Sequence, residues 1–422
     1  MDESGSEPKI SPFSALKFPE FRAFLGMRMC ITFAIQIQAV VIGWHIYQLT
    51  HDALSLGLIG LTEAVPALSI ALLAGHIADN WDRKKILMLI ILGQILSSLI
   101  LLLATNPHIQ TYYPVSWQIA ILYGMIFFNG IFRGFYSPTA GSMTALMVPR
   151  EYYVTCTTWN MTAFQIAAIV GPAVGGLVFG YFGITAAFSI ILVSNLSAFI
   201  FSRYLKSREV KRGVVYESIF ESLKAGIHFV FHNKMMLSAL SLDLFSVFFG
   251  GAVALLPVFS QDILHVGPKG LGYLRAAPSI GALLSMTYLT FNSPTRKAWK
   301  NLLWAIAGFG MATLIFGFSR NFYLSLFALF LTGIFDSISV IIRSSILNLL
   351  TPDDLRGRVS AVNTMFIGSS NEIGAFESGL SARLLGGAVN SVIFGGSMVI
   401  LIVGYTYTKT KDLLTFNLLD QK

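Results

Sequence analysis

Ionisable side chains lie inside several apolar runs of this sequence. The deepest are the carboxylates Asp243, Asp336, Glu372 and Glu377 and the arginines Arg28, Arg133 and Arg343. A charge near the centre of a membrane helix costs about 3 kcal/mol on insertion scales, so each needs a partner or a wet cavity. Because a carboxylate in a partly dry cavity can take and release protons near neutral pH, the four acids are candidate proton-coupling residues.

Three further charges, Glu63, Arg275 and Arg383, lie nearer the ends of their runs. At such positions a long side chain can reach the membrane interface instead of a buried partner. Each of these residues can therefore have either a structural role at the membrane interface or a functional role inside the bundle.

A charged loop follows the second apolar run, with the sequence Gly-His-Ile-Ala-Asp-Asn-Trp-Asp-Arg-Lys-Lys. It resembles the loop signature of the major facilitator superfamily, Gly-x-x-x-Asp-x-x-x-Arg followed by two basic residues. The resemblance implies a conformational latch made of Gly75, Asp79, Asp82, Arg83 and Lys84, in which Asp79 caps a helix or pairs with Arg83. The alternative is a charged loop that only fixes topology.

A run of small residues lies in the fifth apolar segment, where Gly171, Pro172, Gly175 and Gly176 form Gly-Pro-x-x-Gly-Gly. This resembles a motif of the proton-driven exporters in the same superfamily. Small residues let helices approach closely, and Pro172 bends its helix. Generic tight packing is the alternative to an export-specific role.

The resemblance covers nearly the whole chain, and its segments include 43–50, 255–259, 274–278 and 356–359. They are similar to the branch that contains the enterobactin exporter and macrolide efflux pumps, which implies proton-coupled export. In this fold the first, fourth, seventh and tenth spans line a central cavity. That arrangement would bring Arg28, Arg133, Asp243, Asp336 and Arg343 to the cavity.

The composition requires a membrane to position these residues. Hydrophobic residues make up 55% of the 422 and charged residues 12%, and the mean hydropathy is +0.68. A water-soluble domain could not carry that surface. Each apolar run is near the ~20 residues of a membrane helix, which predicts an all-α protein of twelve transmembrane helices near residues 21–49, 54–79, 84–105, 117–147, 153–180, 184–204, 236–262, 270–291, 300–318, 322–350, 358–385 and 388–408.

The net charge of +8 is placed unevenly along the chain. Lys and Arg crowd alternate connections, such as those at 83–85, 203–212 and 296–300, whereas the opposite connections carry almost none. By the positive-inside rule the basic side is cytoplasmic, so we expect both termini there, in a bacterial cytoplasmic membrane. The basic excess therefore indicates orientation in a lipid bilayer and no nucleic-acid partner.

The chain divides into two halves at its longest connection. We expect a tail at 1–20, six-helix bundles at 21–204 and 236–410, a linker at 205–235 and a second tail at 411–422. Within the linker, apolar residues at helical spacing, from Ile219 to Val230, predict an amphipathic helix on the membrane surface.

The two halves are related in sequence when the chain is shifted by about 203 positions, an internal repeat that aligns Pro149 with Pro352 and Asn160 with Asn363. The same register pairs Arg133 with Asp336. One hypothesis is that these opposite charges meet across the cavity in one conformation. The alternative is that each pairs within its own half, for example Asp336 with Arg343.

Other chemistries lack the residues that they need. The sequence has no phosphate-binding loop, so we expect no ATP use by this chain. It has two cysteines, and His228 and His232 stand without an evident third ligand, so we expect no metal site and no cofactor. No nucleophile, base and orienting residue occur together, which argues against an enzyme.

These observations predict a monomeric secondary transporter that exchanges protons for a small amphipathic molecule, siderophore-like or drug-like, by alternating access. An importer or metal-ion transporter on the same scaffold is the nearest alternative. A membrane receptor or scramblase is a more distant one, because it has little reason to retain the charges inside its spans.

Overall fold

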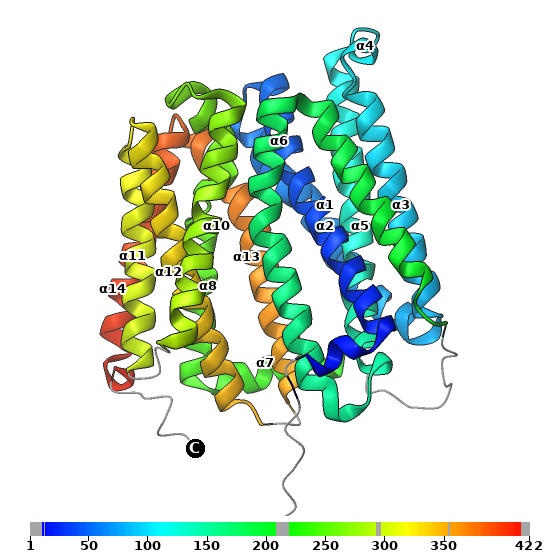
Figure 1. The fold of residues 1–422 in the computed structure, drawn as a ribbon. Coiled ribbons are helices and arrows are strands. Elements are labelled where there is room, and N and C mark those ends of the chain that lie inside the picture. The colour runs from blue at the N-terminus through cyan, green and yellow to red at the C-terminus, as the bar shows by residue number, and fades with distance from the viewer. Residues whose placement is uncertain (1–10, 12, 208–218, 293–296, 353–354, 415–422) are drawn as a thin grey trace, which may run out of the picture.

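The protein is a bundle of long helices in the computed structural model, which describes residues 11, 13–207, 219–292, 297–352 and 355–414 (Figure 1). No strand occurs in those residues. The long elements are α1 (Pro19–Thr50), α2 (Ala53–Asn80), α3 (Arg83–Ala104), α5 (Val115–Met147), α6 (Tyr153–Arg203), α8 (Lys234–Phe249), α10 (Gly267–Phe291), α11 (Ala298–Phe318), α12 (Phe322–Leu350), α13 (Arg356–Leu384) and α14 (Ala388–Lys409).

Twelve spans follow from these elements because α6 contains two of them. Gly183 has φ 83° and ψ 179° inside α6, a conformation that an L-residue rarely adopts, and it separates the fifth span from the sixth. By length and composition alone, nine helices in the described part of the chain can cross a membrane, with α6 counted once and the less apolar α10 and α13 left out. The prediction of an all-α protein with twelve transmembrane helices is confirmed.

The seventh span differs from its prediction as one continuous helix. α8 ends at Gly250-Gly251, and short turns continue the span: η3 (Ala252–Leu255), α9 (Leu256–Val258) and the π-helical η4 (Phe259–Ile263). Two adjacent glycines weaken a helix, and Pro257 supplies no backbone N–H, so the regular hydrogen-bond ladder stops there.

The two ends of the bundle carry different short helices. At one end α4 (Pro107–Gln110) projects between α3 and α5, and at the other end α7 (Ile219–His232) lies across the bundle (Figure 1). We name these the α4 end and the α7 end. The described chain begins and finishes at the α7 end (Figure 1).

The helix α7 lies in the connection where the sequence predicts a helical segment. Fully buried Val230 packs with Met236 and Leu240 of α8 and with Val359 and Val362 of α13. The apolar face of α7 therefore packs against α8 and α13, and this burial stabilises the helix.

The division into halves at 205–235 stays a prediction, and we use "N-terminal half" and "C-terminal half" for the spans before and after it. The packing of the described residues differs between the two ends. At the α4 end one apolar cluster joins both halves, with Trp44 and Phe179 packed together with Leu256 and Phe259. Toward the α7 end the clusters stay within one half each, around Phe24 and Met27 in the first and Trp299 and Ile342 in the second. The halves are therefore held together mainly at the α4 end.

Candidate functional site

Arg133 connects the two halves of the protein through a shared ion pair. Its Nη1 donates to Glu63 Oε1 at 2.8 Å and to Glu372 Oε1 at 2.6 Å. Arg133 comes from α5 and Glu63 from α2, both in the N-terminal half, whereas Glu372 comes from α13 in the C-terminal half. The side chains keep exposures of 42% for Arg133 and 20% for each glutamate, so the group is partly solvated. We call these three residues the Arg133 triad.

The triad lies near the middle of the membrane. Glu63 is about 15 Å along α2 from its first residue, and Glu372 is about 18 Å along α13 from its last, at 1.5 Å per residue. Both distances start at the α4 end, and half of a ~30 Å hydrocarbon core is about 15 Å. Water or protons must therefore cross about half of the hydrocarbon core to reach the triad from either side.

Close helix packing places Glu372 beside the N-terminal half. A Cβ at Gly60 would lie 2.7 Å from the Glu372 carbonyl oxygen, and one at Gly379 would lie 2.8 Å from Gly57 Cα. Glycines at these positions let α2 and α13 approach to backbone contact, as small residues do in membrane bundles. The approach of Gly379 to Gly57 lies on the α4 side of the triad.

The charges of the triad do not balance. Two ionised carboxylates and one guanidinium carry a net charge of −1, which one proton on either acid would neutralise. Removing the guanidinium would leave two uncompensated carboxylates in a poorly solvated place. The arrangement can hold or release one proton depending on whether Glu372 remains beside Arg133.

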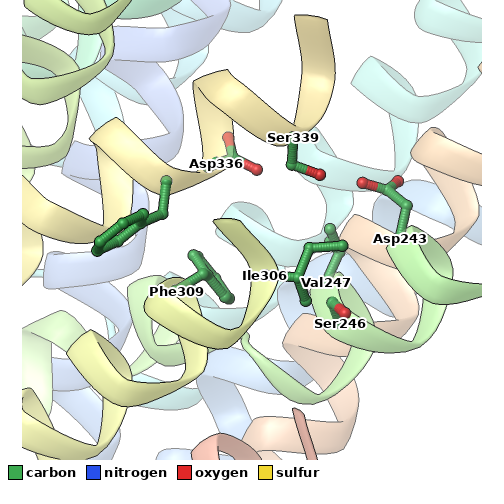
Figure 2. Close-up of a pocket in the computed structure, with 8 residues that line it drawn as sticks. Asp243, Ser246, Val247, Ile306, Phe309, Asp336 and Ser339 are labelled. Atoms are coloured by element: carbon green, nitrogen blue, oxygen red, sulfur yellow. The ribbon is translucent and has the colours of Figure 1, made fainter. Parts of the chain in front are cut away.

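A second ion pair lies inside the C-terminal half. Arg343 of α12 contacts Asp243 of α8, and both side chains are buried. Asp336, also on α12, is exposed and lines a small cavity together with Asp243 (Figure 2). The structure thus brings three of the predicted residues together, although Arg343 pairs with Asp243 instead of Asp336.

Two other predicted residues have local contacts. Glu377 accepts a hydrogen bond of 2.5 Å from Ser381 on its own helix. Arg28 is half-buried in α1, with its guanidinium carbon 6.0 Å from the centre of the Phe24 ring. Neither contact joins the Arg133 triad.

The hypothesis that Arg133 meets Asp336 does not describe this conformation, in which Arg133 binds the two glutamates of its triad. For Glu63 the sequence leaves a structural and a functional role open, and the structure shows that its side chain reaches Arg133 inside the bundle. The sequence feature that could have identified Glu63 is the presence of an acidic residue within an apolar run. The pairing depends on the spatial contact of α2 with α5 and α13, which spacing along the chain does not specify.

Polar contacts across the halves lie at the α4 end. The Tyr47 hydroxyl of α1 donates to Asp262 in η4, and the hydroxyls of Tyr181 and Tyr273 are 2.8 Å apart between α6 and α10. The Lys269 ammonium lies 4.6 Å from the centre of the Tyr181 ring. These contacts must break if the halves separate at this end.

The Gly-Pro-x-x-Gly-Gly segment brings α6 against two helices. A Cβ at Gly171 would lie 2.6 Å from Gln36 Cβ, and one at Gly175 would lie 2.9 Å from Ile37 Cα, both on α1. Gly176 faces the other half, where its Cβ would lie 2.4 Å from Gly272 Cα. Pro172 lies within α6 between these contacts.

The predicted latch is only partly visible. Gly75 and Asp79 belong to α2, but their surroundings lie outside the described residues. Asp82 is the N-cap of α3 and accepts from Lys84 N at 2.9 Å, while Lys84 Nζ donates to Arg203 O at 3.2 Å. Arg83 is the first residue of α3. The Lys84 contact ties α3 to the end of α6 within the N-terminal half, whereas the Asp82 contact caps α3 itself.

Comparison with known proteins agrees with this architecture. A family model described as Major Facilitator Superfamily matches residues 24–375. The enterobactin exporter EntS of Shigella flexneri is 22% identical over 85% of this chain and 83% of its own length. The multidrug efflux pump Tap of Mycolicibacterium fortuitum is 23% identical over 87% of this chain and 90% of its own.

Solved structures share the fold. A bacterial homologue of the human lysosomal transporter Spinster, in an inward-facing and unoccupied conformation, gives a TM-score of 0.71 at 13% identity, covering 97% of this chain and 98% of that one. The nucleoside transporter NupG gives 0.66 at 12% identity, covering 94% and 98%. At these identities the likeness concerns the fold alone.

Proposed function

Because the chain belongs to the major facilitator superfamily, we propose that this membrane transporter exports a small amphipathic compound in exchange for protons. The observation that carries the proposal is the Arg133 triad, in which the Glu372 carboxylate of one half is paired with the Arg133 guanidinium of the other half. Coupling by alternating access needs a group whose proton affinity changes when the halves move.

The proposed direction rests on topology and on relatives. Basic residues crowd the connections of the α7 end, such as 83–85 and 203–206, so the positive-inside rule makes this end cytoplasmic. The halves share their apolar cluster at the α4 end, which is then the closed, outer end. This conformation suits loading from the cytoplasm, and two relatives of the chain are named as exporters.

The proposed cycle follows from the position of Glu372. In the conformation described here, Arg133 stabilises Glu372 as a carboxylate. When the α2–α13 contact opens toward the outside, Glu372 moves away from Arg133 and takes a proton, because an isolated charge is costly at that depth. When the halves close again, Arg133 favours the carboxylate, and the proton leaves to the cytoplasm.

The cargo is proposed from the relatives, one named for enterobactin and one for multidrug efflux. Both names describe export, and we propose a small molecule with apolar surface as the cargo of this chain. A cytoplasmic membrane location and a monomeric protein without ATP are parts of the same proposal.

Purified protein in liposomes under an imposed pH gradient tests this function. The test compounds are ethidium, a macrolide and a catecholate siderophore. Antiport predicts accumulation of at least one of them when the lumen is more acidic than the bath, in either orientation of the protein. Accumulation with an alkaline lumen would instead identify a proton symporter. Equal transport under both gradients would refute proton coupling, and no movement of any compound would favour the receptor or scramblase alternatives.

The variants Glu372→Gln and Glu377→Gln separate the triad from the rest of α13. Both changes remove one carboxylate from the same helix. We expect Glu372→Gln to abolish gradient-driven accumulation while keeping downhill exchange, and Glu377→Gln to keep both, because Glu377 bonds only within its own helix. Full coupling in Glu372→Gln would remove the triad from the mechanism.

A further inference from the structure

A cavity of about 10 Å³ lies between α8, α11 and α12, close to the size that holds one water molecule. Its polar lining is Asp243 and Ser246 from α8 and Asp336 and Ser339 from α12, and Ile306 and Phe309 of α11 are part of the rest (Figure 2). Four oxygen-bearing side chains around so small a volume are more than apolar packing requires.

The Ser339 hydroxyl is the group in this cavity that lacks a hydrogen-bond partner. Its side chain is 3% exposed, and its hydroxyl has no hydrogen-bond partner in the described structure. A buried hydroxyl without a partner is costly, and native proteins usually satisfy it with an ordered water. Ser339 lines the cavity together with Asp336 and Asp243 (Figure 2), whose carboxylates are acceptors for such a water.

The other polar groups of the cavity differ in the hydrogen bonds and ion pairs that they already make. The Ser246 hydroxyl already donates to Leu242 O at 2.5 Å, which leaves it as an acceptor. Asp243 is buried and contacts Arg343, whereas Asp336 is exposed and has no hydrogen bond or ion pair to any described residue. An exposed acid therefore stands on one side of the cavity and a buried acid on the other.

The charged residues that line the cavity come from α8 and α12. Asp243 is contributed by α8, and α12 itself adds Arg343 beside it. At this level α11 presents Ile306 and Phe309, and α10 contacts α12 through Gly281 and Ser285. Two acids and one guanidinium again leave a net charge of −1, which a single proton would balance.

We infer that the C-terminal half holds a second proton-binding site, in which a water in this cavity bridges Asp336, Ser339 and Asp243. A proton on Asp336 passes to the bridging water, and the water gives one of its own protons to Asp243. One O–H bond breaks and one forms at each step, and the water is regenerated. Asp243 then becomes neutral and loses its charge pairing with Arg343, which loosens the contact between α8 and α12.

A metal cation fits the same cavity less well. The Arg343 guanidinium lies against Asp243 and would repel a bound Na⁺. The cavity offers two hydroxyls and two carboxylates as possible metal ligands, and the Asp243 carboxylate already contacts Arg343. The inference goes beyond the proposed function, since proton binding here does not depend on Glu372.

Infrared spectroscopy of the protein reconstituted in lipid tests the site without a transport assay. The quantity measured is the carboxylic-acid C=O band as the pH is lowered, in wild type, Asp336→Asn and Ser339→Ala. Ser345→Ala is the matched control, because its hydroxyl donates to Ile341 O within the same helix. Glu372→Gln removes the signal of the Arg133 triad.

We expect one band to be lost in Asp336→Asn and to persist in Glu372→Gln and Ser345→Ala. In Ser339→Ala the midpoint of that band should move by about half to one pH unit, the equivalent of one hydrogen bond. A wild-type spectrum in Asp336→Asn, or an unmoved midpoint in Ser339→Ala, would overturn the site. A midpoint that falls when NaCl replaces choline chloride would show a Na⁺ site in place of the water bridge.

Discussion

Gly176 is the position where a single methyl group should separate the two halves. A Cβ there would lie 2.4 Å from Gly272 Cα, and a backbone atom cannot rotate away as a side chain can. Overpacking of this kind costs about 1–3 kcal/mol. The contact exists only while the α4 end is closed, so Gly176→Ala should raise the ratio of open to closed molecules by about 5–150-fold.

Two other glycines provide matched controls. Gly171→Ala would place its Cβ 2.6 Å from Gln36 Cβ, within the N-terminal half, so it should lower thermal stability without changing the ratio of conformations. At Gly404 of α14 nothing outside its own helix lies within 4 Å of an added Cβ, so Gly404→Ala should leave the ratio of conformations unchanged and should not lower thermal stability.

Distances between spin labels at Phe182 and Leu384 report this equilibrium, since both residues are exposed, lie at the α4 end and belong to different halves. Cys30 and Cys156 are first replaced so that only the introduced cysteines carry labels. Pulsed electron resonance should show one short distance in wild type and an added longer one in Gly176→Ala. An unchanged distribution in Gly176→Ala, or an equal change in Gly171→Ala, would refute the reasoning.

Two further predictions concern orientation and the outer contacts. Cysteines introduced beside Lys84 should be shielded from impermeant thiol reagents in intact cells, while those beside Asn106 react; the reverse pattern would invert the topology. Tyr47→Phe removes the hydrogen bond to Asp262 across the halves, and should favour the open α4 end by about five-fold in the spin-label measurement. Tyr123→Phe should leave the ratio unchanged, because its hydroxyl donates within the N-terminal half, and equal effects of the two changes would contradict this role.

The twelve spans could be predicted from the sequence because apolar length and flanking polar residues determine each of them independently. The separation of the fifth and sixth spans at Gly183 was also visible, since glycine tolerates the positive φ found there. The interruption at Gly250-Gly251 was not, because the run stays apolar through it. Likewise the pattern of α7 predicts an apolar face but does not distinguish lipid from the helix ends that cover Val230.

The sequence predicted individual residues of the candidate site but not how they pair. Arg133, Glu372, Asp243 and Arg343 were identified from the cost of charges in apolar runs, which is a local property. Their pairing depends on which helices touch, and the contact of α2 with α13 rests on glycines that spacing alone does not relate to Glu372. The internal repeat aligned Arg133 with Asp336 but did not specify the partners of either.

Proton movement driven by the exported compound tests the central claim most directly. Liposomes that contain a pH-sensitive dye and a compound shown to be transported are diluted into compound-free buffer at equal pH. We expect outflow through wild type to acidify the lumen, whereas Glu372→Gln should release the compound without a pH change. Outflow from wild type with no pH change, or equal acidification by Glu372→Gln, would contradict coupling through the Arg133 triad.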